Sequence, residues 1–196
     1  MKILESLVNS YFTFHYGIGF AIGLIFFCGY MILTTRKKKS QGQSVSKKEI
    51  LCGLALSVYL IILLGGTILN RDIDKEFAIK LTPFWSYYEA IIEKDKGLAF
   101  QMLGNVLIFI PLGVLLPEVW DRIRNIRWII LIAASVSFSL ELVQLIFRLG
   151  LFEFDDVFHN VLGAVIGYGL FILFHIIHFS IGQRTATDAA VKCKGN

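Results

Sequence analysis

Apolar residues in this chain are gathered into long runs, and short polar segments separate one run from the next. An α-helix needs about 20 mostly apolar residues to cross the hydrocarbon core of a bilayer. Five runs reach or approach that length: residues 16–33, 50–69, 100–116, 128–147 and 157–179. The pattern predicts an all-α fold, a polytopic membrane helix bundle with about five transmembrane helices.

The basic residues between the runs predict how the bundle is oriented. If the N-terminus lies outside, the segments on the cytoplasmic side hold 12 of the 19 lysines and arginines. Short cytoplasmic loops of membrane proteins are enriched in these residues, so the sequence predicts an N-out, C-in topology. We expect a transmembrane domain at residues 1–182, followed by a disordered cytoplasmic tail at residues 183–196.

Composition and charge narrow the class of protein. Charged residues make up only 17% of the chain, whereas soluble domains carry about 25%. The net charge of +4 lies in short loops, so we expect contact with membrane lipids and no nucleic-acid partner. The three cysteines lack the spacing of a metal site or a disulfide framework, and the sequence predicts neither a metal nor a cofactor.

The fourth run ends in polar residues that share one face of the expected helix. Glu141, Gln144 and Arg148 follow one another at positions i, i+3 and i+7. A charged side chain in the middle of a span costs at least about 2.5–3.5 kcal/mol on insertion scales. A carboxylate inside the run therefore indicates a functional site, and Glu141 is the residue hardest to explain by structure alone.

The fifth run begins with a second polar face, made by Asp156, His159 and Asn160 at i, i+3 and i+4. Asn105 lies in the same half of the membrane in the third run. The loop between the fourth and fifth runs is short, so these two helices are antiparallel neighbours and their polar faces meet. We predict a polar cluster open to the outer surface, with these ligand-binding residues: Asn105, Glu141, Gln144, Arg148, Asp156 and Asn160.

Structural explanations of the same residues stay open. Polar side chains in spans can serve as hydrogen bonds between helices, each contributing about 0.6 kcal/mol on average. Asp155 or Asp156 can cap the start of the fifth helix. Gly163 and Gly167 form a GxxxG pattern, which permits close approach of another helix and predicts a possible homo-oligomer. In the long loop after the second run, "PFWSYYEAIIEK" predicts a short helix at the membrane interface.

Three stretches of the chain resemble the VanZ-like family of bacterial membrane proteins: "GNVLIFIPLGVLLP", "ELVQLIF" and "FDDVFHNVLGAVIGY". The upstream "KLTPFWSY" is similar to the family's Asn-Leu-x-Pro-Phe element, with Lys80 where asparagine is common. The resemblance covers about residues 55–175. Carried over by position, the family pattern picks out Asn105, Pro111, Glu141, Gln144, Asp156 and Asn160. It implies a multi-pass protein of the bacterial plasma membrane whose named relative is linked to low-level teicoplanin resistance.

Three functions stay open for the polar cluster. The preferred one is a non-enzymatic envelope protein that binds an amphiphile there: a lipid-linked cell-wall precursor, another lipid or a lipoglycopeptide such as teicoplanin. The second is an intramembrane enzyme acting on a lipid or cell-wall precursor, with Glu141, Asp156 and His159 as candidate catalytic residues. The sequence contains none of the common hydrolase or nucleotide-binding motifs that would favour it. The third is a carrier, which the absence of an internal repeat disfavours.

Overall fold

The computed structural model describes the backbone of residues 2–69 and 79–194, and the side chains of residues 17–68 and 79–180. Helices dominate this part of the chain. The elements in chain order are α1 (Lys2–Ser40), α2 (Lys47–Leu64), η1 (Gly65–Leu69), β1 (Ile79–Lys80), α3 (Trp85–Ile91), α4 (Lys96–Val119), η2 (Asp121–Ile123), α5 (Ile126–Ile146), β2 (Phe152–Glu153) and α6 (Phe154–Lys194).

Five helices in the described part of the chain are long and apolar enough to cross a membrane. Their spans are Gly17–Ser40, Lys47–Ile68, Lys96–Val119, Ile126–Ile146 and Phe154–Ser180. Only 17% to 39% of each apolar window is buried inside the protein, so most of its apolar side chains face outward. A surface of this kind fits contact with lipid, and the predicted all-α membrane bundle is confirmed.

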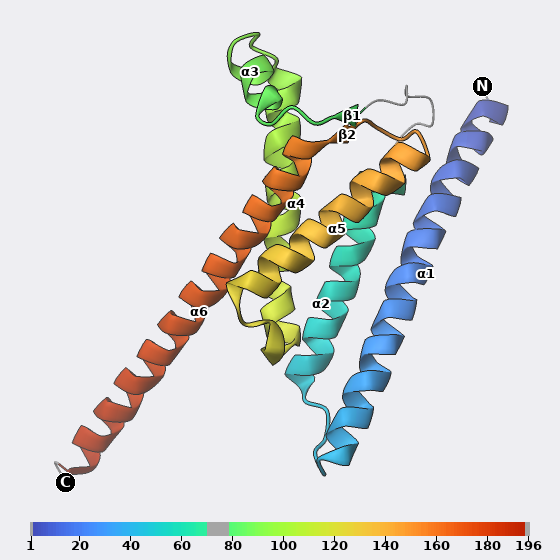
Figure 1. The fold of residues 1–196 in the computed structure, drawn as a ribbon. Coiled ribbons are helices and arrows are strands. Elements are labelled where there is room, and N and C mark those ends of the chain that lie inside the picture. Colours follow the sequence, from blue (N-terminus) through green and yellow to red (C-terminus); the bar gives the residue numbers. More distant parts are fainter. Residues whose placement is uncertain (1, 70–78, 195–196) are drawn as a thin grey trace.

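The five spans form a bundle whose two ends differ (Figure 1). One end carries β1, β2 and α3, and we call it the strand end. The other end carries the α1–α2 turn and η2 with the basic residues of 36–48 and 122–127, and we call it the basic end. The N- and C-termini lie at opposite ends (Figure 1). Which end faces outward stays a prediction from the positive-inside tendency.

The buried core lies between α2, α4 and α5. Leu63, Phe109 and Ile129 are at most 1% exposed and come from these three helices in turn. Pro111 and Pro117 both lie inside α4, which continues through them to Val119. The helices therefore pack around a small apolar centre, and their remaining apolar surface is left for lipid.

Glycines permit the close packing of α4 against α6, the most extensive helix pair in the described chain. A β-carbon at Gly163 would overlap the backbone carbonyl of Val106, and one at Gly167 would overlap the carbonyl of Ile110. Gly113 on α4 meets the backbone of α6 in the same way. The GxxxG pattern thus packs within the chain, and the homo-oligomer through Gly163 and Gly167 stays a prediction.

The last helix is longer than the sequence predicts. α6 continues to Lys194, whereas the sequence predicts a disordered tail from residue 183. Three alanines lie between residues 184 and 194, and alanine has the highest intrinsic helix propensity. Residues 195–196 lie outside the described part of the chain.

Candidate functional site

The carboxylate of Asp155 joins the start of α6 to the start of α3. Its Oδ1 accepts a hydrogen bond from the Phe84 amide at 2.7 Å. Its Oδ2 accepts one from the Ser86 amide at 3.0 Å and another from the Ser86 hydroxyl at 2.5 Å. Asp155 and Ser86 are each 1% exposed, so water does not compete for these bonds. Phe84 has a φ of 62°, a conformation that non-glycine residues rarely adopt, and Asp155 holds its amide in place.

Glu141 supports the two-stranded sheet at the strand end. β1 and β2 pair in parallel, with Ile79 opposite Phe152 and Lys80 opposite Glu153. The Glu141 carboxylate accepts a hydrogen bond from the Glu153 amide at 3.1 Å. Glu141 is 3% exposed, so its carboxylate meets a backbone donor within the protein instead of water. The structure therefore gives the carboxylate of α5 a contact with β2, the strand that leads directly into α6.

Gln144 and Asn160 both form hydrogen bonds between elements. The Gln144 side-chain amide donates to the carbonyl of Thr67 in η1 at 2.9 Å. The Asn160 side-chain amide donates to the hydroxyl of Ser137 on α5 at 2.8 Å. These contacts match the structural explanation that the sequence left open, because each one links a span to another part of the bundle.

Asp156 and His159 lie on one face of α6 and meet polar residues of other elements. The Gln101 side-chain amide of α4 donates to Asp156 at 3.3 Å. Nε2 of His159 lies 3.0 Å from the hydroxyl oxygen of Tyr87 on α3. Burial, with a smaller effect from the charge of Asp155, raises the pKa of Tyr87, so the phenol keeps its proton at neutral pH. Tyr87 can therefore act as the donor in this bond.

Three buried polar atoms near α4 and α6 have no hydrogen-bond partner among the described residues: Asn105 Nδ2, His159 Nδ1 and Asn160 Oδ1. His159 is 2% exposed and Asn160 is 5% exposed. On α4, Asn105 directly precedes Val106, whose backbone packs on Gly163 of α6. Gly163 lies about one turn after Asn160, so Asn105 and Asn160 lie at nearly the same level of the bundle. Buried polar atoms without a partner are uncommon in folded proteins, so each of these three atoms calls for a partner such as a water molecule or a ligand group.

Arg148 lies apart from these residues. Its side chain is exposed, and its backbone has a φ of 56° directly after α5. The Arg148 amide donates to Leu145 at 3.2 Å and the Leu149 amide donates to Gln144 at 2.8 Å. These bonds form a Schellman motif with Arg148 in the left-handed position that usually holds glycine. The position of Arg148 thus follows from how the helix ends.

Most of the predicted site residues lie toward the strand end of the bundle, in α4, α5 and α6, and from here on we call the following set the polar cluster. Its members are Asn105, Glu141, Gln144, Asp156, His159 and Asn160. Sequence reasoning missed Ser86, Tyr87 and Gln101, which meet the start of α6 from α3 and α4. Ser137 was within reach of the periodicity argument, because it lies four residues before Glu141 on the same helical face.

Comparison with known proteins identifies the family of this chain. A sequence model of the VanZ/LLP1 family matches residues 20–175. The chain belongs to the VanZ/LLP1 family. Protein VanZ of Enterococcus faecium is 27% identical over 132 residues, which cover 66% of this chain and 75% of that protein. No solved structure is significantly similar.

Membership of the VanZ/LLP1 family confirms the resemblance seen in the sequence. The matched residues run from the first span to residue 175 in the last one, so they include α3, both strands and the polar cluster. The protein is therefore a VanZ-family membrane protein.

Proposed function

We propose that this VanZ-family protein lowers the susceptibility of the cell to teicoplanin by binding an amphiphile at the polar cluster. The named relative supplies the class of phenotype, since the resemblance implies low-level resistance to this lipoglycopeptide. The polar cluster lies inside a bundle whose outward surface is apolar, which suits a molecule with a polar group and an acyl chain.

One observation carries this proposal, the buried imidazole of His159. With the Tyr87 phenol as donor, Nε2 accepts, and the proton of the neutral ring lies on Nδ1. Nδ1 is then a buried N–H group without an acceptor among the described residues. Leaving such a donor unpaired costs about 1–3 kcal/mol, so a ligand oxygen at this point would recover that energy.

Asn105 and Asn160 offer two further polar atoms without a partner among the described residues. The Asn105 side-chain nitrogen offers a second donor, and the Asn160 side-chain oxygen offers an acceptor. A peptide-like amide or a hydroxyl carries both kinds of partner, whereas a simple anion carries acceptors alone. The set therefore favours a polar group with donors and acceptors, as in a peptide or a sugar.

The contacts of Glu141 favour binding over the enzymatic alternative. A general acid or base must come within hydrogen-bond reach of the proton that it transfers. The Glu141 carboxylate accepts from the amide of Glu153, so a positioning role as an anchor for β2 accounts for it. We therefore assign the binding role to His159 and its amide neighbours, and a positioning role to Glu141.

Antibiotic susceptibility in a bacterial host that lacks the gene tests the proposal. Cells carrying the wild type, His159→Gln, Asp156→Asn or Glu141→Gln are compared at equal membrane expression. Glu93→Gln is the matched control, because Glu93 is exposed near α3 and outside the polar cluster. We expect the wild type, Glu93→Gln and Glu141→Gln to raise the inhibitory concentration of teicoplanin, and His159→Gln and Asp156→Asn to lose that effect.

A glycopeptide without an acyl chain provides the second arm of the experiment. If the bound group belongs to an amphiphile, protection is stronger against teicoplanin than against the glycopeptide that lacks the chain. Equal protection by the wild type and the variants of the polar cluster would remove the cluster from the mechanism. Loss of protection by Glu141→Gln at unchanged thermal stability would favour the acid–base alternative.

A further inference from the structure

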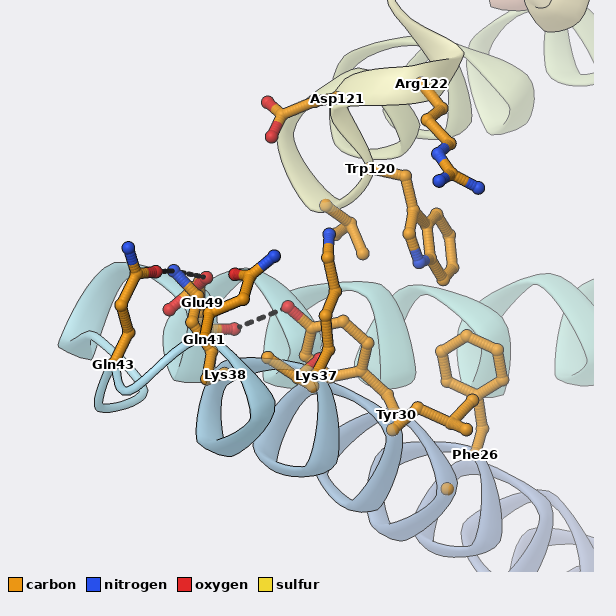
Figure 2. A pocket seen from close by; sticks show the side chains of 14 residues that line it. Phe26, Tyr30, Lys37, Lys38, Gln41, Gln43, Glu49, Trp120, Asp121 and Arg122 are labelled. Atoms are coloured by element: carbon orange, nitrogen blue, oxygen red, sulfur yellow. Dashed lines mark hydrogen bonds and ion pairs between the residues drawn. The ribbon is translucent and has the colours of Figure 1, made fainter.

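A cavity lies at the basic end of the bundle, and Figure 2 shows the side chains that line it. Its volume is about 910 Å³, and its walls come from α1, α2 and the junction between α4 and η2. Ligand pockets in proteins commonly measure about 300–1,000 Å³. The cavity is therefore large enough for the headgroup of a lipid and the first part of its chain.

The α1 wall of this cavity changes from apolar to basic along the helix. Phe26, Tyr30, Leu33 and Lys37 line it at successive turns of one helical face. Phe26 and Lys37 are 11 positions apart, which corresponds to about 16 Å along the axis at 1.5 Å per residue. An amphiphile lying along this face would meet apolar side chains first and a cation at the end.

Both acidic residues of the cavity wall are already paired. The Glu49 carboxylate lies 3.0 Å from the Lys38 ammonium and also accepts from the Ser46 amide at 2.8 Å. The Asp121 carboxylate lies 3.0 Å from the Arg124 guanidinium. These contacts neutralise the acids, so they do not compensate the remaining cations of the wall.

Lys37 and Arg122 are those remaining cations. Both side chains are exposed, and neither forms an ion pair within the described residues. Figure 2 shows the Lys37 ammonium and the Arg122 guanidinium on either side of the Trp120 side chain. The two groups come from different elements, α1 and η2, and face the same cavity. Together they leave two positive charges for a bound anion.

The aromatic part of the wall is fixed by contacts of its own. Tyr30 is 6% exposed, and its hydroxyl donates to the Glu49 carbonyl at 3.2 Å. The Tyr30 and Trp120 rings meet edge to face at a centroid distance of 6.1 Å. Tryptophan and tyrosine are enriched where lipid headgroups begin, because their rings combine an apolar body with a polar tip. The aromatic wall of the cavity is thus held in place by its own contacts, and its residue types are those typical of the headgroup region.

We propose that this cavity binds an anionic phospholipid. Lys37 and Arg122 hold the phosphodiester, Trp120 packs against the headgroup region, and one acyl chain lies along Phe26 and Leu33. Guanidinium and ammonium groups bind phosphate oxygens through charge-assisted hydrogen bonds. The positive-inside tendency places this end in the cytoplasmic leaflet, where anionic lipids attract basic segments. The proposal does not depend on the function of the polar cluster.

Thermal unfolding of the purified full chain in a neutral detergent tests this site. Dioleoyl phosphatidylglycerol, dioleoyl phosphatidylcholine and inorganic phosphate are added separately at equal phosphate concentration. We expect phosphatidylglycerol to raise the Tm by about 3 °C or more above the value with phosphatidylcholine, since a ligand that binds only the folded state stabilises it. Inorganic phosphate should give no such shift, because it lacks the acyl chain.

Two double variants with the same change of charge separate the cavity from the basic surface in general. Lys37→Gln/Arg122→Gln should lose most of the difference between the two lipids. Lys47→Gln/Arg127→Gln should keep it, because these exposed residues lie at the same end but outside the cavity wall. Equal losses in both double variants, or no loss in either, would overturn the proposal.

A second readout covers the case in which the first double variant does not fold. Native mass spectrometry counts the phosphatidylglycerol molecules retained by the single variants Lys37→Gln and Arg122→Gln. Each should retain fewer than the wild type, and Lys47→Gln should match the wild type. A shift of the Tm by inorganic phosphate equal to that by phosphatidylglycerol would show a site for free phosphate and would rule out the lipid.

Discussion

Asp155 and Ser86 are 69 residues apart in the sequence, yet the Ser86 hydroxyl donates a hydrogen bond to the Asp155 carboxylate across 2.5 Å. The same carboxylate holds the amides that precede and begin α3. Tyr87 follows Ser86 directly and meets His159 on α6. Asp155 therefore fixes α3 at the strand end of the bundle. It also sets where the Tyr87 phenol meets the buried imidazole of His159.

Asp155→Asn should release α3. An asparagine keeps one acceptor but turns an amide group toward backbone donors, so at least one amide among Phe84 and Ser86 loses its partner. Hydrogen bonds to a charged group contribute about 1.5–3 kcal/mol each, so we expect Asp155→Asn to lower the free energy of unfolding by about 2–4 kcal/mol. Thermal unfolding in detergent and limited proteolysis of residues 81–95 measure the effect. Glu89→Gln, an exposed change on α3, is the control, and equal protease resistance of both variants would contradict the prediction.

Glu141 should tolerate glutamine better than alanine. The side chain of a glutamine keeps an oxygen that can accept from the Glu153 amide, whereas alanine leaves that buried amide without its acceptor. We expect Glu141→Ala to lower the free energy of unfolding by about 1–3 kcal/mol more than Glu141→Gln does. Thermal unfolding of the two variants side by side gives this difference. Equal losses would show that the charge of Glu141, and not its acceptor, supports the fold.

The membrane helices could be predicted from the sequence because the apolar runs are long enough to span a bilayer. Each run had to lie in lipid as a helix, because backbone groups in a bilayer must pair within the segment. The polar positions at i, i+3 and i+4 indicated which helix faces meet, as at Asn160, which contacts Ser137 on α5. Family resemblance and physical reasoning share five residues and differ at Pro111 and Arg148. They overlap because a polar side chain inside a span is costly wherever it lies.

The partners of those residues could not be predicted in the same way. Ser86 and Tyr87 come from a long loop whose path depends on tertiary contacts, and no periodicity relates them to α6. The parallel pairing of β1 with β2 joins two segments of two residues each, which is too short to leave a pattern in the sequence. Gly163 indicated close packing, but the sequence alone could not say whether α4 or a second copy supplies the neighbour.

Alanine at Gly163 should disturb the packing of α4 against α6. The added methyl group would overlap the Val106 carbonyl, which belongs to helical backbone and cannot rotate away. Overpacking of this kind costs about 1–3 kcal/mol, and a lower Tm in detergent should report it. Gly169→Ala is the matched control on the same helix, because nothing lies within 4 Å of its added β-carbon.

The two glycine variants should also change the free energy of unfolding in opposite directions. Alanine favours a helix over glycine by about 0.5–1 kcal/mol, so Gly169→Ala should be neutral or stabilising. A Gly163→Ala protein as stable as Gly169→Ala would contradict the packing of α4 on α6. If Gly163→Ala kept its Tm but changed the size of the particle in detergent, the glycine face would instead serve an interface between copies.

Replacing Arg148 with glycine should stabilise the protein. The left-handed conformation at φ 56° is strained for an arginine but open to glycine, and the two hydrogen bonds of the helix end use backbone atoms only. We expect Arg148→Gly to raise the free energy of unfolding by about 0.5–1 kcal/mol and Arg148→Val to lower it.

The same variants test whether the guanidinium belongs to the ligand site. Because the side chain is exposed and lies apart from the polar cluster, Arg148→Gly should keep teicoplanin protection at the wild-type level. Lost protection in a stabilised Arg148→Gly protein would instead place the arginine in contact with the ligand.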